Sequence, residues 1–447
     1  MTAADSSARD TAFDVRQDAL LRLGCNEGTL RIGGVDAEEL VETFGSPLYA
    51  YDASIFRQQL AEVRNAMGPR VDVLHCVKAN PSLAITDLFR REGAGVEVAS
   101  AGEILLAKAA GHEGAAMQFA GPGKSEAELR LAGRVGLGCL NLESVAEYEA
   151  LKRVALADGF RPRVALRVNP AVAVSGSRMA MGGATKKFGI DAAEVVELAQ
   201  TLVSEDVVDL LGLHTYAGTQ SFDAEAWLEH ASHVLRLLNE VESATGKAMT
   251  SLNLGGGFGV PCFEGDQPFD LARVGDGVQE LLAADGRPER RTHVELGRFL
   301  VAHAGVYLTR VTYQKNSGGR QHAILDGGMH HHAAAAGLGA ILRRTYPWVW
   351  CRDVAAERSQ SYCLGGPLCT PADELGTAVQ LPELSPGDLL AVLVSGAYGL
   401  TFSNTMFLSH PTPAEVLVDA GRATVIRAAG DVHDVLRGQS LPDAEPS

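Results

Sequence analysis

Residues 71–100, VDVLHCVKANPSLAITDLFRREGAGVEVAS, contain the pattern that decides the fold. An almost wholly apolar run opens this stretch, a segment with the period of an amphipathic helix follows, and a short β-branched run closes it. Outward from this stretch, the same strand and helix unit repeats from about residue 46 to residue 300. Repeated units of this kind predict parallel strands joined by helices.

Eight strands are expected in this region, and several of the helical segments between them have Ser at the N-cap and Gly after the last turn. The expected strands are 71–77, 95–99, 116–121, 139–143, 163–169, 210–216, 251–257 and 292–297. Eight alternations favour a closed (β/α)8 barrel over an open doubly wound sheet. We therefore predict an α/β fold with a TIM barrel over residues 46–303.

The remainder of the chain has a different pattern, in which short alternating strands are separated by turn residues. The expected strands are 306–314, 322–328, 377–383, 388–398, 414–421 and 422–430. They predict a mainly antiparallel β domain over residues 304–434, to which the N-terminal segment 1–45 contributes. Residues 29–51 contain a strand on each side of a short helix and are candidates to join this domain. Residues 435–447 lack a core-forming pattern and are expected to form a flexible tail.

The composition excludes several classes of protein. The 447 residues are 46% hydrophobic and 21% charged, which excludes collagen, coiled coil and general disorder. The net charge of −16 argues against nucleic acid as a partner. The sequence contains neither an apolar run of about 18 residues, as a membrane span needs, nor a signal-peptide pattern, so we expect a cytoplasmic protein without membrane contact. The seven Cys are scattered and form no C-x-x-C pair, so neither a disulfide framework nor a zinc site is predicted.

Polar residues and glycines follow the carboxyl ends of the expected strands, where a barrel of this kind has its active site. Lys78 is either a solvated amine or a desolvated amine with a lowered pKa that can bond to a carbonyl cofactor. The glycines 255–257 form either a plain tight turn or a loop whose backbone N–H groups surround a phosphate. Lys78, this loop and Glu295 together outline a pocket for pyridoxal phosphate.

Six motifs resemble, in order, those of the fold-type III pyridoxal phosphate-dependent decarboxylases, the family of diaminopimelate and ornithine decarboxylases. They are VLHCVKANP (73–81), GVEVASAGEI (95–104), LNLGGGFG (252–259), ELGR (295–298), GPLCTPAD (366–373) and SGAYG (395–399). Four stretches resemble more closely the branch that acts on carrier-protein-linked amino acids, such as the glutamyl carrier-protein decarboxylase of butirosin biosynthesis, and the exosortase-associated decarboxylases. These are GSRMAMGG (176–183), GLHTYAGTQ (212–220), LDGGMHHHAAA (325–335) and GPLCTPADELG (366–376).

The resemblance implies pyridoxal 5'-phosphate as cofactor and a role for each matching residue. Lys78 would bind the cofactor covalently, and Glu295 would keep its pyridine nitrogen protonated. Cys369 would come from the partner subunit of a homodimer with shared active sites and would donate a proton after carbon dioxide has left. The residues implied to bind the cofactor are Lys78, Glu97, Arg167, Tyr216, Thr219, Gly255, Gly256, Gly257, Glu295, Gly297, Arg298 and Tyr398. Among these, Glu97 and Arg167 would form a charged layer near the lysine.

Departures from the family pattern bear on the substrate. The diaminopimelate and ornithine enzymes have an acidic residue directly after the catalytic Cys, whereas this chain has Thr370, which cannot neutralise a buried ammonium group. Asp373 could still contact a substrate amine. Tyr216 replaces the ring-stacking His of the family. Arg298, together with Arg343 or its neighbour Arg344, is a candidate partner for a substrate carboxylate.

We therefore predict a decarboxylase that removes the α-carboxylate of an amino acid linked to a carrier protein or conjugate in a secondary-metabolite pathway. The alternatives are a decarboxylase of a free diamino acid such as diaminopimelate or a siderophore precursor, a racemase, and a catalytically silent regulator. Since carrier proteins are usually acidic, the net charge gives no overall attraction, although Arg178, Lys186 and Lys187 could form a local docking patch. The three histidines 330–332 are assigned to a loop near the active site rather than to a metal, because consecutive residues converge poorly on one ion.

Overall fold

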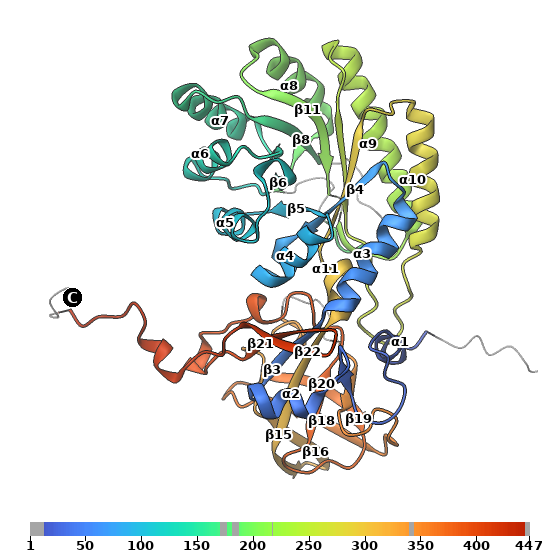
Figure 1. Ribbon diagram of the computed structural model, residues 1–447, viewed down its shortest axis with the longest axis vertical. Helices are drawn as coiled ribbons and strands as arrows, with labels where there is room; N and C mark the ends of the chain where they lie inside the picture. Colours follow the sequence, from blue (N-terminus) through green and yellow to red (C-terminus); the bar gives the residue numbers. More distant parts are fainter. Residues whose placement is uncertain (1–12, 170–176, 181–186, 217, 339–343, 443–447) are drawn as a thin grey trace, which may run out of the picture.

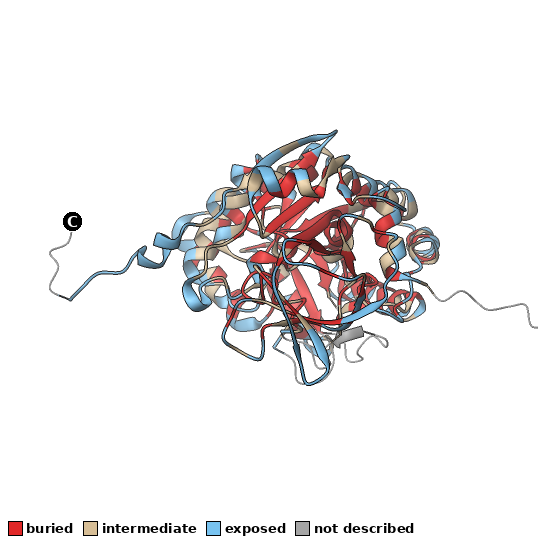
Figure 2. Ribbon diagram, turned by 90° about the horizontal axis from the view of Figure 1, so that it is seen from below, coloured by how far each residue is buried: buried red, intermediate tan, exposed pale blue. Residues whose placement is uncertain are grey.

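The computed structural model describes residues 13–169, 177–180, 187–216, 218–338 and 344–442. In Figure 1 a ring of helices surrounds the parallel strands in the upper part of the molecule, and a second, β-rich part lies below it. Figure 2 shows that buried residues concentrate on the strands in the centre, while exposed residues lie on the outer faces of the helices. The core therefore runs continuously through both parts.

The parallel strands form a closed barrel. Around the barrel they are β8 (Arg163–Asn169), β11 (Asp209–Thr215), β13 (Ser251–Gly256), β14 (Arg291–Leu296), β4 (Val71–Cys76), β5 (Gly95–Val98), β6 (Met117–Phe119) and β7 (Cys139–Leu142). The pairing of β7 with β8 closes the ring. All eight expected strands are confirmed with small differences at their ends, and so is the prediction of a barrel.

The helices follow the strands in alternation and cover the outside of the barrel (Figure 1). They are α3 (Ala53–Met67), α4 (Leu83–Arg91), α5 (Ala101–Ala109), α6 (Glu126–Val135), α7 (Val145–Asp158), α8 (Ala192–Glu205), α9 (Ala224–Thr245), α10 (Leu271–Asp285) and the short α11 (Arg298–Val301). Ser125 caps α6 in a reciprocal capping box with Glu128, and Gly136 ends the helix in the left-handed region. Three short strands in the loops, β9 (Ser177–Ala180), β10 (Ile190–Asp191) and β12 (Gly218–Ser221), are absent from the sequence prediction.

The second part is a mixed sheet that is mainly antiparallel. Its order is β19 (Glu374–Leu381), β18 (Gln360–Gly365), β16 (Arg320–Leu325), β15 (Gly305–Ser317), β3 (Leu48–Asp52), β21 (Ala414–Asp419) and β22 (Arg422–Arg427), and β20 (Leu389–Val392) joins β15 to β17 (Trp348–Trp350). The six expected strands are present, whereas β17 and β18 were not predicted. Helices α1 (Val15–Arg22) and α2 (Ala37–Phe44) and the hairpin of β1 (Arg31–Ile32) and β2 (Val35–Asp36) complete the N-terminal segment.

Strand β3 shows where the chain passes from the sheet to the barrel. It pairs antiparallel with β15 and parallel with β21, so it belongs to the second sheet. All five of its residues are buried, because it lies in the middle of that sheet. The barrel thus begins with α3 at Ala53, after the expected boundary at residue 46.

At the C-terminus, the 3-10 helix η6 (Val432–Leu436) follows the last strand, and residues 431–442 are exposed. In Figure 1 this segment extends away from the body of the molecule. No helix among the described residues is both long and apolar enough to span a membrane. The expected cytoplasmic location stays a prediction.

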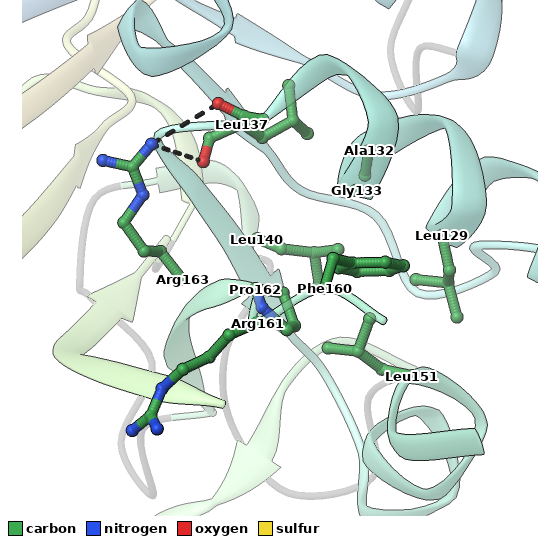
Figure 3. Close-up of a pocket in the computed structure, with 11 residues that line it drawn as sticks. Leu129, Ala132, Gly133, Leu137, Leu140, Leu151, Phe160, Arg161, Pro162 and Arg163 are labelled. Atoms are coloured by element: carbon green, nitrogen blue, oxygen red, sulfur yellow. Dashed lines mark hydrogen bonds between the residues drawn. The ribbon is translucent and has the colours of Figure 1, made fainter. Parts of the chain in front are cut away.

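An apolar pocket lies on the outside of the barrel between α6 and α7. Figure 3 shows Phe160 beside Leu129, Leu140 and Leu151, with the arginines at the edge of the pocket extending away from these apolar side chains. One of them, Arg163, donates hydrogen bonds to the backbone carbonyls of Gly136 and Leu137 in the loop between α6 and β7. Since Arg163 is the first residue of β8, the pocket lies at the amino end of this strand, away from the carboxyl ends where the site residues gather.

Candidate active site

Lys78 lies at the carboxyl end of β4, in the single 3-10 turn η1 (Val77–Ala79). Its Nζ is 2.5 Å from Oε2 of Glu97, whose side chain is only 1% exposed. The parallel pairing of Cys76 with Glu97 brings the two groups together, because β4 and β5 are neighbours in the barrel. The half-buried lysine and the buried glutamate form a close ion pair.

This pair corrects the expected pKa of the lysine. Burial lowers the pKa of Lys78, but the negative charge of Glu97, with contributions from Cys76, Tyr398 and Glu295, raises the pKa well above its usual value. The prediction of a lowered pKa is therefore wrong for the protein by itself. Lys78 is a cation here, and it has to lose a proton before its nitrogen can act as a nucleophile.

Glu295 is the residue before the end of β14 and is almost completely buried. Its Oε1 accepts hydrogen bonds from Asn253 Nδ2 at 2.8 Å and from His214 Nε2 at 3.1 Å. Burial alone would raise the pKa of Glu295, but His214, followed by the charges of Lys78 and Arg167, lowers the pKa to about 2. The carboxylate is therefore ionised and able to stabilise a positive charge placed next to it.

His214 and Asn253 are partners of Glu295 that the sequence reasoning did not assign. They lie on β11 and β13, and both strands neighbour each other in the barrel. A polar residue in an otherwise apolar barrel strand, one to three positions before the strand ends, is the signal that could have found them.

The predicted charged layer contains two separate ion pairs. Arg167 on β8 is buried, and its guanidinium donates to Glu143 Oε1 at 2.6 Å. Glu143 also accepts backbone N–H groups from Gly121 and Gly189, at 2.7 and 3.2 Å. Arg167 thus pairs with Glu143 rather than with Glu97, because β7 is its neighbour in the barrel.

The glycines at the carboxyl end of β13 have no space for a side chain. A Cβ atom on Gly257, whose φ is +86°, would lie 2.0 Å from Gly218 O. A Cβ atom on Gly256 would lie 1.8 Å from Glu295 O, and one on Gly255 would lie 2.3 Å from Thr215 O. These positions accept only glycine, so the backbone is free to approach a bound group closely.

Tyr398 joins the β domain to the barrel at this mouth. Its backbone N–H donates to Ala79 O at 2.8 Å, directly beside Lys78, and its φ of +54° is left-handed. Its ring lies 4.9 Å from the guanidinium carbon of Arg298, and its hydroxyl lies 3.7 Å from the position of a Cβ atom on Gly297. Burial raises the pKa of Tyr398, so the phenol stays protonated and can donate a hydrogen bond.

Two further expected residues lie at the same mouth. Tyr216 follows β11, and burial, with the nearby Tyr398 as the second cause, raises its pKa. Thr219 lies on β12, where it pairs with Met179 of β9. Both thus belong to the segment that follows β11, close to the glycine loop.

The loop that holds Cys369 lies outside the barrel. Cys369 is exposed, unlike the other six cysteines, which are all buried. Asp373 fixes this loop, because its carboxylate accepts Leu368 N at 2.8 Å and Met329 N at 2.6 Å. Thr370 contributes a hydroxyl that accepts Ala372 N at 3.3 Å. With both oxygens of Asp373 engaged by the backbone, the geometry does not favour the expected contact with a substrate amine.

Of the arginine candidates, Arg343 lies outside the described residues. Arg344 forms an ion pair with Asp266 at 3.1 Å and donates to Glu264 O at 2.6 Å. In the expected docking patch, Lys186 and the side chain of Arg178 are likewise not described, and Lys187 Nζ lies 5.1 Å from the ring centre of Phe188.

The three consecutive histidines are buried. His331 Nε2 contacts Pro411 O at 2.8 Å, and His332 Nε2 contacts Ser395 Oγ at 3.0 Å. Burial lowers the pKa of His330, His331 and His332 to about 3, 4 and 3, so all three are neutral at pH 7. In the part of the chain that the structure describes, no cluster of His, Cys, Asp and Glu could hold a metal ion.

The donors at this mouth fit pyridoxal phosphate. An ionised carboxylate, Glu295, suits a protonated pyridine nitrogen, and a primary amine, Lys78, suits an aldehyde. Arg298 Nε is buried and has no hydrogen-bond partner among the described residues, while the rest of the guanidinium contacts Tyr346 and Tyr398, so one N–H group of this cation can still bind an anionic group. Gly257 and Gly297 carry no side chain that would separate their backbone from that anion.

Comparisons with known proteins agree with this geometry. The family model described as the pyridoxal binding domain of pyridoxal-dependent decarboxylases matches residues 53–302. An L-glutamyl-[BtrI acyl-carrier protein] decarboxylase from Niallia circulans is 38% identical over 408 residues, which cover 90% of this chain and 95% of the relative. Diaminopimelate decarboxylase from Bacillus subtilis is 31% identical over 421 residues, 92% of this chain and 95% of the relative.

A solved structure shows the same fold. Diaminopimelate decarboxylase from Helicobacter pylori, complexed with L-lysine, aligns with a TM-score of 0.83 and 26% identity, covering 90% of this chain and 98% of the other. The family model begins at Ala53, the residue at which α3 starts the barrel. With the cofactor site, the fold and these similarities in agreement, the chain belongs to the pyridoxal-dependent decarboxylases and is a pyridoxal phosphate-dependent enzyme of that family.

Proposed function

We propose that this decarboxylase acts on an amino acid whose distal end is joined to a carrier protein or another conjugate, in a secondary-metabolite pathway. The observation that carries the proposal is the loop around Cys369, which contributes Thr370 and a backbone-bound Asp373. Neither group is a free carboxylate for a distal ammonium. An unpaired ammonium in a desolvated pocket costs several kcal/mol, whereas a thioester or amide at the same end carries no charge.

The similarities support the same substrate class. The relative from Niallia circulans acts, by its name, on an L-glutamyl group on an acyl-carrier protein, and it is 38% identical. The diaminopimelate decarboxylase from Bacillus subtilis is 31% identical, and by its name it acts on a free diamino acid, so this similarity favours the alternative substrate.

We assign the cofactor contacts as follows. Lys78 would be the covalent anchor, Glu295 would pair with the pyridine nitrogen, and the loop 255–257, Gly297 and Arg298 would hold the phosphate. When bound, pyridoxal phosphate supplies an electron sink for the electron pair that departing carbon dioxide leaves behind. The ionised Glu295 would hold a proton on the ring nitrogen, and the hydroxyl of Tyr398 would donate a hydrogen bond to the phosphate.

A second part of the proposal is a homodimer with shared active sites. Cys369 is exposed on a loop outside the barrel, so its thiol is free to reach the barrel mouth of a partner subunit. There it returns a proton to the α-carbon from which carbon dioxide has left. The segment after Tyr398 exposes several large apolar side chains, which a partner subunit would cover. They are Phe402, Met406, Phe407 and Leu408.

Subunit exchange tests the shared site. Lys78→Ala and Cys369→Ala are each expected to be inactive or nearly so as separate proteins. A mixture of the two is expected to regain activity, since a mixed dimer has one site with both wild-type residues. No gain after verified subunit exchange would contradict the shared site.

The substrate is tested by carbon dioxide release. With pyridoxal phosphate present, we expect release from glutamyl or related aminoacyl carrier proteins and little from free diaminopimelate, ornithine or glutamate. Thr370→Glu is expected to raise activity on free diamino acids, because it adds the missing carboxylate, and Thr370→Gln is the uncharged control of the same length. Release from a free diamino acid by the wild type, without release from any carrier, would overturn the substrate proposal in favour of the alternative.

A further inference from the structure

Asn253 joins three parts of the barrel interior through one side chain. It lies on β13 and is 1% exposed. Its Nδ2 donates to Glu295 Oε1 at 2.8 Å and to Gln118 Oε1 at 2.7 Å, and its Oδ1 accepts Gly255 N at 2.9 Å. All of its hydrogen-bonding groups are therefore used within the barrel.

The chemistry of these neighbours fixes which way the amide points. The ionised Glu295 can only accept hydrogen bonds, and the backbone N–H of Gly255 can only donate. The amide nitrogen must therefore face Glu295, and the amide oxygen must face Gly255. Gln118 adds a second acceptor on the nitrogen side, which opposes a flip of the amide.

The contact with Glu295 orients the carboxylate. Asn253 and His214 both bind Oε1, whereas Oε2 receives no hydrogen bond from the described residues. One oxygen is therefore held in place and the other is left for a ligand. This is the arrangement that a carboxylate needs to meet a protonated ring nitrogen at a fixed angle.

The contact with Gly255 acts on the opposite end of the pocket. Gly255 has a φ of +68°, and it is the first residue of the glycine loop. Because its N–H is tied to Asn253, the peptide groups that follow, at Gly256 and Gly257, leave the strand in a set direction. The side chain of Asn253 thus contacts both the carboxylate of Glu295 and the glycine loop.

We propose that Asn253 is a positioning residue that couples the two ends of the cofactor pocket, the carboxylate for the ring nitrogen and the glycine loop for the phosphate. The inference rests on the proposed placement of the cofactor between Glu295 and the loop 255–257. It adds to that placement a physical connection between the two ends, through a residue that does not itself touch the cofactor.

Two substitutions separate the two contacts. Asn253→Asp has the same shape and keeps the acceptor for Gly255 N, but it puts a second carboxylate next to Glu295, so one of the two acids must take up a proton. Asn253→Leu has a similar volume and removes both contacts. Thr292→Val is the matched control: it also changes a buried polar residue of the barrel, on the strand that carries Glu295, but its hydroxyl has no hydrogen-bond partner among the described residues.

The experiment measures binding of pyridoxal phosphate and of pyridoxal, which lacks the phosphate, to each apoprotein at equilibrium. Asn253→Asp is expected to weaken both ligands by the same factor, about 10-fold to 100-fold. It is also expected to shift the pH dependence of the absorbance of the bound cofactor, which a merely structural change would leave alone. Asn253→Leu is expected to weaken pyridoxal phosphate more than pyridoxal, so the ratio of the two affinities falls only in this variant.

Gln118→Leu provides a further variant in case Asn253→Leu does not fold. It keeps Asn253 and Glu295 but removes the outer acceptor, and a smaller weakening of both ligands is expected. Unchanged affinities and pH profile in Asn253→Asp, or an equal loss in Thr292→Val, would overturn the inference. The binding experiment uses no substrate, so a negative result does not affect the proposal of a carrier-linked substrate. Conversely, carbon dioxide release from free diamino acids alone would overturn the substrate proposal but not the role of Asn253.

Discussion

Gly257→Ala is the substitution that tests the phosphate loop most sharply. The φ of Gly257 is +86°, which costs an L-residue about 1–2 kcal/mol. The added Cβ atom would also lie 2.0 Å from Gly218 O, closer than the 3.0 Å below which real Cβ atoms essentially never approach a neighbour. The glycine loop and β12 therefore have to move apart by about an ångström.

The effect of Gly257→Ala on cofactor affinity depends on whether the strain is present in the apoprotein or only in the holoenzyme. Without cofactor, the loop can relax away from Gly218, so the apoprotein is expected to lose about as much stability as the strained φ costs, as the control below does. Cofactor binding has to restore the loop, and the strain then opposes binding. A cost of about 1.4–2.8 kcal/mol corresponds to a dissociation constant for pyridoxal phosphate that is about 10-fold to 100-fold higher.

The assay is an absorbance titration of apoprotein with pyridoxal phosphate, together with thermal unfolding. Gly286→Ala is the matched control, since Gly286 has a similar φ of +65° at the end of α10 but no atom within 4 Å of the added Cβ atom. The control is expected to lose some stability from the same backbone strain and to bind the cofactor normally. Equal binding by Gly257→Ala and wild type would refute the placement of the phosphate at this loop.

Three other changes test separate parts of the account. Glu295 has its pKa lowered from 4.5 to about 2, so it stabilises the folded state above pH 4.5 and this contribution is lost as the pH falls towards 2. In urea unfolding of the apoprotein, Glu295→Gln should therefore remove about 3 kcal/mol of the stability loss at acid pH, and an unchanged pH dependence would count against this role of Glu295. The side chain of Lys124 is 1% exposed and lies 2.6 Å from the buried Glu147, so Lys124→Met should cost about 3–5 kcal/mol in urea unfolding. Lys152→Met, in the partly exposed pair with Glu205, should change the stability little, and equal effects of the two substitutions would contradict this. Asp373→Asn should place an N–H group against a backbone N–H group, loosen the Cys369 loop and lower turnover with the cofactor still bound, and normal turnover would refute the role of this carboxylate.

The repeated strand and helix pattern was sufficient to predict the barrel, because each buried strand alternates with an amphipathic helix over a long stretch. The loop strands β9, β10 and β12 were not predictable in this way, since they are too short to show a period. Residues 29–51 were candidates for the β domain although the barrel boundary was placed at residue 46, and the pairing of β3 with β15 and β21 shows that this strand belongs to the second sheet.

The site was predictable at the level of residue types and less so at the level of contacts. The carboxyl ends of the strands pointed to Lys78 and Glu295, because a barrel gathers these ends at one mouth. Sequence distance did not reveal that Glu97 would pair with Lys78 closely enough to raise its pKa. Nor did it reveal that Asn253 and His214 converge on one oxygen of Glu295, since three strands of the closed barrel must come together to create that contact.

Lys78 is the residue that we propose to hold the cofactor at the barrel mouth. The most direct test is to fix pyridoxal phosphate to the holoenzyme by borohydride reduction, digest the protein and locate the modified lysine by mass spectrometry. We expect modification of the peptide that contains Lys78, with no modification of the buried Lys124, and loss of the modified peptide in Lys78→Ala. Modification of another lysine in the native holoenzyme, with Lys78 unmodified, would contradict the account.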